Sequence, residues 1–246
     1  MKQIKTNFSM DKSTHCWSVF DKIYCISLDE RSDRREEAKN QFDKIGLLKY
    51  VEFFIVKKHP HDSEEGIFES HIACIKKGLA AGAGRIVIFE DDVIFDGFSP
   101  ECLKQCIDYM RDASDWKAFF FGCLVSGSRK THIKGVLAIK YRSLTHAYVL
   151  NRRFAELLVE KPWRKIAYDA ELKSYKDGFY AIFPSFAFQS NSPTGNSKYL
   201  RLDKFRRLCG GLQRIQKRNE WYHRSRSIFI ALHILFILLI VFWFFR

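Results

Sequence analysis

Short apolar runs alternate with amphipathic segments along residues 20–190. The runs have the length of β-strands, and the segments between them carry apolar residues at helical spacing. Such an alternation is typical of one α/β domain with a mainly parallel sheet flanked by helices. The predicted strands span residues 22–28, 51–56, 86–89, 118–123, 136–141, 179–183 and 186–188.

Helix starts are predicted at polar residues that can accept a hydrogen bond from the first helical turn. Pro100 follows one of them, and proline is favoured at the first helical position. Gly46 suits the end of the first helix, because glycine readily adopts the left-handed conformation there. The predicted N-caps are Asp33, Ser70, Ser99, Asn151 and Asp169.

The apolar run 86–89 ends in three carboxylates, Glu90, Asp91 and Asp92. A continuous apolar run fits a strand that is buried on both faces, and ligands of open α/β sheets bind at the ends of such strands. Three acids in one place repel one another unless a cation neutralises them. They either hold a divalent cation with phosphate on its far side or are solvated turn residues.

Composition adds a local charge feature to this picture. The 246 residues are 47% hydrophobic, enough for one sizeable core, and carry a net charge of +13. Between residues 198 and 226, ten Lys and Arg face two acids, so this segment alone contributes +8. The seven cysteines are odd in number and include no Cys-x-x-Cys pair, which predicts free thiols in a reducing compartment.

Four parts of the chain are predicted from these patterns. Residues 1–19 form a polar extension without the apolar core of a secretory signal, and residues 20–197 form the α/β domain. Residues 198–227 form a basic amphipathic helix, and residues 228–245 form an apolar helix. The turn-rich stretch 190–197 marks the end of the α/β domain.

The two C-terminal parts are predicted to meet a membrane. A basic amphipathic helix suits an anionic membrane surface, while nucleic-acid binding and a plain solvated helix are the alternatives. The apolar part would span roughly 27 Å, near the hydrocarbon thickness of about 30 Å. Basic residues precede it and only Arg246 follows it, which predicts a single-pass C-terminal anchor with the large domain in the cytoplasm. A buried hairpin or a partner-binding helix is the alternative for this short segment.

Six motifs occur along the α/β domain in a characteristic order. They are a strand and Asp-Arg-Arg helix start at 23–35, Glu-Ser-His at 69–71, Phe-Glu-Asp-Asp at 89–92, Thr-His-Ala-Tyr-Val-Leu at 145–150, Asp169 with Leu172, and Phe-Pro-Ser-Phe-Ala-Phe-Gln at 183–189. In this order and spacing they resemble glycosyltransferase family 25, which includes lipopolysaccharide-type glycosyltransferases and collagen galactosyltransferases. The chain departs from the family pattern at Glu69 and His146, which bears on the choice of acceptor.

The resemblance implies a GT-A-type fold, a UDP-sugar as donor, and Mn²⁺ or Mg²⁺ as cofactor. The acidic triplet would be the DxD-type motif, with Asp92 as a direct metal ligand. Asp91 would be a second ligand or, like Glu90, bind through water or the donor ribose. A hard cation held by one or two carboxylates and the phosphates would assist departure of the diphosphate.

Arginines at the start of the first helix are candidates for recognition of the diphosphate or nucleotide, because their fork is planar and always charged. Arg31, Arg34 and Arg35 lie there, and Arg34 matches an arginine of the family. The alternative is a solvated helix start in which the arginines pair with Glu36 and Glu37.

The remaining candidates serve the reaction or the donor. An inverting transfer needs a general base for the acceptor hydroxyl; Asp169 matches a family aspartate, and Glu171 is the second choice. His71, in the first turn of its predicted helix, either faces the nucleotide pocket or is structural. His146 contacts the donor sugar or metal, or packs beside Tyr148.

Gln189 is a candidate partner for sugar hydroxyl groups. Together these residues predict a membrane-associated, metal-dependent inverting glycosyltransferase. It would move a hexose such as galactose from a UDP-sugar to a glycan or glycolipid acceptor such as a lipopolysaccharide or lipooligosaccharide, with no nucleic-acid partner. The alternative function is a non-catalytic, membrane-tethered protein of the same fold that binds nucleotide sugars or glycans.

Overall fold

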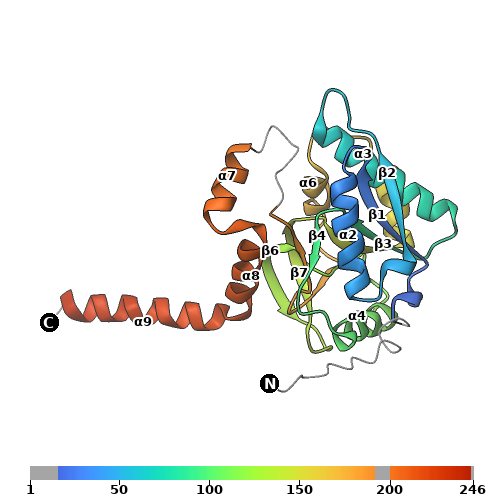
Figure 1. Ribbon diagram of the computed structural model, residues 1–246. Helices are drawn as coiled ribbons and strands as arrows, with labels where there is room; N and C mark the ends of the chain where they lie inside the picture. Colours follow the sequence, from blue (N-terminus) through green and yellow to red (C-terminus); the bar gives the residue numbers. More distant parts are fainter. Residues whose placement is uncertain (1–15, 192–199, 245–246) are drawn as a thin grey trace, which may run out of the picture.

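An eight-stranded sheet forms the centre of the computed structural model, which describes residues 16–191 and 200–244 (Figure 1). Six strands run in one direction, and β8 and β7 run against them. The predicted mainly parallel sheet is confirmed for strand direction, although each reversed strand makes its neighbouring pairings antiparallel. In spatial order the strands are β2 (Val51–Val56), β1 (Lys22–Leu28), β3 (Arg85–Glu90), β8 (Ala147–Asn151), β5 (Ala118–Phe120), β9 (Phe179–Ile182), β7 (Val136–Ser143) and β6 (Leu124–Lys130).

Helices cover both faces of the sheet and create two hydrophobic clusters. Strand β3 is buried along its apolar run, and its side chains alternate between the two clusters, with Val87 and Phe89 in one and Ile86 and Ile88 in the other. The first cluster includes residues of α2 (Ser32–Lys44) and α4 (Pro100–Asp112). The second includes residues of α3 (Ser63–Ala80), α5 (Arg152–Val159) and α6 (Tyr168–Lys173). The prediction of a strand buried on both faces is therefore confirmed.

Two of the predicted helix caps are confirmed by direct hydrogen bonds. The Ser99 hydroxyl accepts from the backbone N–H of Cys102 at 3.2 Å, and the Asn151 side chain accepts from that of Phe154 at 2.7 Å. Both residues combine an extended backbone with a short polar side chain, the usual N-cap geometry. Helix α4 starts at Pro100, directly after the Ser99 cap, as predicted.

The other three predicted caps are wrong. Helix α3 begins seven residues before Ser70, because Asp62 accepts from the N–H of Glu64 and caps it; Ser70 instead donates to a carbonyl within the helix. Asp33 is the second residue of α2, and Asp169 lies in the first turn of α6. Helices α2 and α6 have Arg31 and Ala167 at their N-cap positions, without a side-chain cap hydrogen bond, so neither start carries a capping signal in the sequence.

Several short elements were not predicted. Strands β4 (Val93–Phe95), β6 and β8 are among them. The antiparallel pairing of β4 with β10 (Ala187–Gln189) was also not predicted, although a strand was predicted over 186–188. The run 118–123 is a strand only as far as Phe120. Two short 3₁₀ helices complete the domain, η1 (Trp17–Val19) and η2 (Leu48–Tyr50). None of the seven cysteines, which all lie in the described residues, forms a disulfide, as predicted.

The predicted single basic helix over 198–227 is wrong, because the segment is broken into two helices. Helix α7 (Leu200–Leu208) and helix α8 (Gly211–Arg224) meet at Gly210 and Gly211, whose φ angles are +90° and +87°. Only glycine adopts such angles readily, so the pair ends one helix and redirects the chain. The predicted domain boundary at 190–197 lies mostly outside the described residues.

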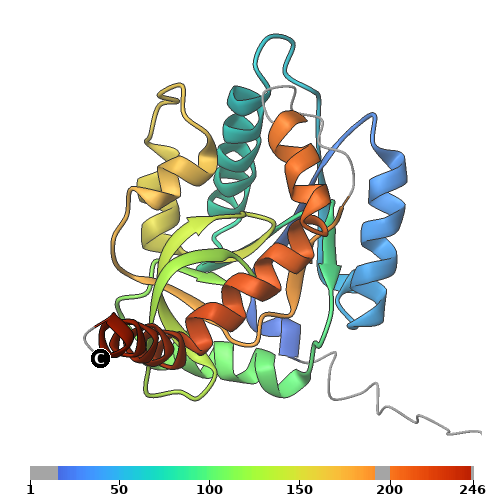
Figure 2. The same cartoon turned by 90° about the vertical axis from the view of Figure 1, so that its left-hand side faces the viewer.

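Helix α8 packs against the α/β domain instead of standing free. The buried Gln216 donates to the carbonyl of Ala187, and Asn219 both accepts from and donates to the backbone of Val125 on β6. Glu220 accepts from the N–H of Ser185. Figure 2 shows α8 running across the face that the view presents, with α9 (Arg226–Phe244) pointing towards the viewer.

Helix α9 is exposed along its length and projects away from the domain (Figure 1). Among the described residues it is the one helix long and apolar enough to cross a membrane, with 19 residues and a mean hydropathy of 2.8. Length and composition are the basis of this statement, and they agree with the predicted apolar helix at 228–245.

Candidate functional site

A cleft of about 270 Å³ opens at the carboxyl ends of β1 and β3. Parallel strands end at the same edge of a sheet, so the polar residues that follow them gather there. The short β4–β10 pair and helices α7 and α8 add further walls. Residues that line the cleft include Ser27, Arg31, Arg34, Lys57, Lys58, Ser70, His71, Glu90, Asp91, Asp92, Gln189, Ser190, Asp203, Arg206 and Leu212.

Asp92 is held on one side and open on the other. Gln189 donates its side-chain N–H to Asp92 Oδ2 at 2.8 Å, because β10 pairs with β4 directly after the acidic triplet. Asp92 Oδ1 is buried and has no hydrogen-bond partner among the described residues. Burial and the charge of Glu90 raise the pKa of Asp92 to about 7, against the opposing charge of Arg34. A buried oxygen without a partner is costly unless a ligand supplies one.

Arg34 faces two of the three acids. Its guanidinium lies 3.4 Å from Asp91 Oδ1 and 3.9 Å from Asp92 Oδ2. Burial raises the pKa of Asp91, while Ser27 and Arg34 hold it down in part. One arginine therefore faces two largely buried carboxylates, and a bound cation would favour the ionised form of both.

Glu90 points towards the opposite wall. Thr145 donates to Glu90 Oε1 at 2.7 Å, and His71 Nε2 lies 3.6 Å from the same oxygen. Burial alone would raise the pKa of Glu90, but hydrogen bonds and charge from His71 outweigh it, and the net shift is downward. Glu90 is therefore held as a carboxylate that orients residues around the cleft.

His71 is both structural and part of the cleft wall. Its ring stacks on Tyr168 with centroids 4.2 Å apart, and its Nδ1 lies 2.8 Å from the Tyr148 hydroxyl. The prediction that it lies in the first turn of a helix is wrong, because α3 starts at Ser63. His71 itself is buried in the middle of α3, and this position fixes the ring more firmly than a helix end would.

Three predicted residues do not line the cleft. Asp169 accepts from the Tyr141 hydroxyl at 2.6 Å and from the N–H of Leu144 at 3.2 Å. The buried Glu171 pairs with Arg164 at 2.6 Å. His146 is fully buried, and its backbone carbonyl accepts from the N–H of Glu90.

The pKa values of two of these residues reflect burial. Burial raises the pKa of Asp169, with partial compensation by Tyr141, and the charges of Glu90 and His71 reach it. Burial lowers the pKa of His146. Asp169 directly follows Tyr168, whose ring stacks on His71 in the cleft wall, and its catalytic role stays a prediction. Both ring nitrogens of His146 are buried without a hydrogen-bond partner among the described residues, and its role also stays a prediction.

The first-helix arginines divide into different roles. Arg31 binds Asp33 at 2.7 Å and borders the cleft, and Arg35 donates to the carbonyl of Asp29 and to that of Leu28. The partners of Arg31 and Arg35 are thus Asp33 and backbone carbonyls, and not the predicted Glu36 and Glu37. Arg34 is the arginine that meets the acidic triplet.

Sequence reasoning missed two cleft residues on α7, Asp203 and Arg206. Their segment was assigned to the membrane surface because of its charge. Their spacing of three residues places them on one face of a helix, which is a detectable signal once the helix is known to lie over the cleft.

A divalent cation fits the donor set of the cleft. Among residues 16–191 and 200–244, no group of three or more His, Cys, Asp or Glu side chains could hold a metal ion alone. Asp91 and Asp92 offer two carboxylates, and cations such as Mg²⁺ commonly bind to one or two carboxylates with substrate phosphates completing the shell. The unpartnered Asp92 Oδ1 is a free donor atom for such an ion, as far as the described residues go.

The chain is similar to characterised sequences over part of its length, although no model of a protein family matches it. A protein of Aedes aegypti named "Glycosyltransferase 25 family member" is 26% identical over 181 residues, which cover 58% of this chain. The chain spans only 29% of that relative.

Solved structures with some similarity include A197 from STIV, with a TM-score of 0.44, 11% identity, and coverage of 69% of this chain and 85% of that one. Mannose-1-phosphate geranyltransferase from Thermus thermophilus gives a TM-score of 0.43, 8% identity, and coverage of 67% and 75%. A glycosyltransferase involved in glycosylation of the major capsid of PBCV-1 gives a TM-score of 0.38, 12% identity, and coverage of 61% of this chain and 73% of that one. By sequence, the α/β domain is thus similar to glycosyltransferase family 25, as its motifs indicate.

Proposed function

We propose that this chain is a metal-dependent, inverting glycosyltransferase that uses a UDP-sugar. The observation that carries the proposal is the buried pair Asp91 and Asp92, set against Arg34 at the end of β3, with Asp92 Oδ1 lacking a partner among the described residues. The sequence similarity to a glycosyltransferase 25 family member supports it. The transferred group would be a hexose such as galactose, and the fold would be of the GT-A type.

Asp92, with Asp91 beside it, would hold Mn²⁺ or Mg²⁺. Such a cation supplies Lewis-acid stabilisation of the departing diphosphate when it is bound. The chain itself fixes both carboxylates before any ligand arrives: Gln189 orients Asp92 and Arg34 orients Asp91. Preorganised charge of this kind reduces the reorganisation needed during reaction.

Basic side chains around the cleft would bind the diphosphate and nucleotide. Arg31, Lys57, Lys58 and Arg206 line the cleft, and they come from three separate segments of the chain. Arginine forks suit phosphate oxygens, and lysine adds point charges. Binding from several sides would order the donor with its anomeric carbon facing the acceptor.

The transfer needs a base that takes the acceptor proton while the acceptor oxygen attacks and the bond to the diphosphate breaks. Asp169 is our candidate, because burial raises its pKa and it lies near Glu90 and His71. Glu171 is a weaker candidate, since Arg164 already engages its carboxylate. Catalytic contacts often tighten only when substrates bind, so the present contacts of Asp169 are compatible with this role.

The acceptor would be a glycan or a membrane-associated glycolipid, such as a lipopolysaccharide or lipooligosaccharide. Helix α9 would cross the bilayer, with the α/β domain on the cytoplasmic side. Helix α8, which packs on β6 and β10, would then fix the cleft at a short distance from the membrane. A lipid-linked acceptor could reach the cleft without leaving the bilayer.

The experiment that tests the proposal measures nucleotide release by the full chain in neutral-lipid nanodiscs. The protein is incubated with Mn²⁺ and a panel of UDP-, GDP- and CMP-sugars, and D92N runs beside D108N. Asp108 is a surface carboxylate paired with Lys104 on α4, so D108N removes one charge far from the cleft. We expect release from a UDP-sugar that stops with D92N or a chelator and persists with D108N. Donor binding without release, even with candidate glycolipid acceptors present, would contradict the assignment.

A second function is favoured by one observation. The two acids predicted for catalysis are engaged by Tyr141 and Arg164 outside the cleft lining. A non-catalytic, membrane-tethered protein that binds nucleotide sugars would need the acidic triplet but no base. Metal-dependent UDP-sugar binding in the complete absence of turnover is the result that this alternative predicts.

A further inference from the structure

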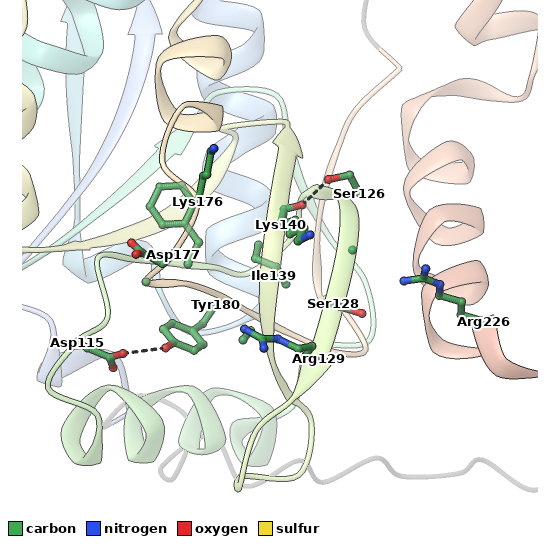
Figure 3. A pocket seen from close by; sticks show the side chains of 14 residues that line it. Asp115, Ser126, Ser128, Arg129, Ile139, Lys140, Lys176, Asp177, Tyr180 and Arg226 are labelled. Carbon is green, nitrogen blue, oxygen red and sulfur yellow. Dashed lines mark hydrogen bonds between the residues drawn. The ribbon is translucent and has the colours of Figure 1, made fainter.

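A second and larger cavity, of about 680 Å³, lies at the opposite edge of the sheet (Figure 3). Its walls come from the residues before β5 and β9, from the β6–β7 hairpin and from the first residue of α9. The cleft described above gathers residues that follow β1 and β3, so the two sites lie at different ends of strands that run in the same direction. The volume falls within the range of about 300–1,000 Å³ typical of ligand sites.

Four cations line this cavity: Arg129, Lys140, Lys176 and Arg226. All are exposed, and none forms an ion pair with a described carboxylate. The two acids of the lining are engaged elsewhere, because Asp115 accepts from the Tyr180 hydroxyl at 3.4 Å and Asp177 pairs with Lys117. In Figure 3, Arg129 lies on the hairpin between Tyr180 and Arg226. The cavity therefore presents unneutralised positive charge from three separate segments.

The position of Arg226 links the cavity to the membrane. Arg226 is the first residue of α9, and the next seventeen residues carry no acidic or basic side chain apart from His233. If α9 spans the bilayer as proposed above, its first residue lies at the level of the lipid headgroups. Arg129 and Lys140, which share the cavity with Arg226, then lie at about the same level.

We propose that this cavity binds the phosphate of an anionic phospholipid headgroup. Arginine recognises phosphate oxygens through two parallel N–H groups, and each cation near an anionic surface adds roughly 1 kcal/mol of attraction, a fivefold gain in affinity. The hydroxyl groups of Ser126 and Ser128 lie in the same lining and suit a glycerol headgroup. The bound lipid would hold the β6–β7 edge against the membrane and limit rotation of the domain about α9.

The test compares the thermal midpoint of the full chain in two nanodiscs, one of phosphatidylcholine and one that also contains phosphatidylglycerol. We expect phosphatidylglycerol to raise the midpoint of the wild-type chain by several degrees, on the order of 5 °C. R129Q/K140Q should lose most of this increment. The matched control K76Q/K173Q removes two exposed lysines of α3 and α6 that lie outside the cavity, and it should keep the increment.

Other results would overturn the inference. If phosphatidylglycerol did not raise the thermal midpoint of the wild-type chain, the cavity would not bind this headgroup. If both double variants reduced the rise equally, positive charge would act diffusely and not through the cavity. An equal rise with inorganic phosphate in phosphatidylcholine discs would assign the cavity to free phosphate instead of lipid. Incorporation of the chain into the discs is scored separately, so failure of α9 to insert is distinguishable from failure of headgroup binding.

Discussion

Asp92 should destabilise the free protein, and its replacement by asparagine should therefore stabilise the fold while abolishing donor binding. The pKa of Asp92 is raised to about 7, mainly because the carboxylate is buried and secondly because Glu90 lies nearby. A raised pKa means that folding favours the protonated acid. The stability that Asp92 contributes is complete below its unfolded pKa of about 4, and it is lost as pH rises to about 7.

The size of this effect follows from the shift. About three pKa units correspond to roughly 4 kcal/mol lost between pH 4 and pH 7, as an upper bound. An asparagine can still accept the hydrogen bond from Gln189, but its buried amide carries a desolvation cost of its own. We therefore expect D92N to gain on the order of 2 kcal/mol at pH 8, or about 4–8 °C in thermal midpoint, and clearly less at pH 5.

The assay records thermal or denaturant unfolding of the full chain at pH 5 and pH 8 without metal, and again with Mn²⁺ and UDP. Ligand should raise the midpoint of the wild-type chain and leave that of D92N unchanged. D108N is the control with the opposite sign, because Lys104 holds the pKa of Asp108 below its usual range. If D92N were no more stable than the wild-type chain at pH 8, burial of the Asp92 carboxylate would not destabilise the free protein.

Three further substitutions separate the roles of residues around the cleft. R34Q should weaken Mn²⁺-dependent UDP binding about tenfold or more by calorimetry, since it removes the cation that positions Asp91; unchanged affinity would exclude this role. R206Q should weaken UDP binding several-fold, whereas K204Q, which removes an exposed charge of the same helix outside the cleft lining, should not; equal effects would show that α7 contributes only general charge. D169N should lower kcat by at least about a hundredfold with little change in UDP affinity, and a loss of affinity or fold instead would mark Asp169 as a structural partner of Tyr141.

Sequence patterns predicted the parts of this fold in which one strong signal dominates. The run 86–89 is apolar without interruption, and it is the buried strand whose side chains enter both clusters. Ser99 and Asn151 were predictable as caps because each directly precedes an apolar helical stripe. The position of Glu90, Asp91 and Asp92 in the cleft was also predictable, because the carboxyl ends of parallel strands lie at the same edge of a sheet.

Contacts between distant segments were not predictable from local patterns. Asp169 was assigned as a cap, but Tyr141, 28 residues away, takes its carboxylate. Gln189 was expected to meet the sugar, but the β4–β10 pair turns it onto Asp92, 97 residues away. The first case depends on the packing of α6 against β7. The second depends on two short strands whose pairing is set by the rest of the fold and not by their own sequence.

The basic C-terminal segment shows what composition alone could not place. Its charge predicted contact with the membrane, yet most of its polar contacts with the domain come from uncharged or acidic residues, beside one exposed pair of Lys217 with Asp96. Gln216 and Glu220 bond to backbone groups of the segment 185–187, Asn219 bonds to the backbone of Val125, and these bonds orient α8. The glycine pair 210–211 then turns α7 back so that Asp203 and Arg206 reach the cleft.

The same chain segment therefore connects the cleft to the apolar helix α9. Removal of everything after Asn191 would take Arg206 and Leu212 from the cleft wall as well as α9, and would expose the backbone of Val125 that Asn219 covers. A soluble form made by such a truncation should lose donor affinity for reasons unrelated to the membrane. A form ending after Arg224 keeps α7 and α8, so it should retain UDP binding in detergent-free solution. Equal UDP affinity of both truncated forms, measured in folded protein, would show that the C-terminal helices are an anchor only.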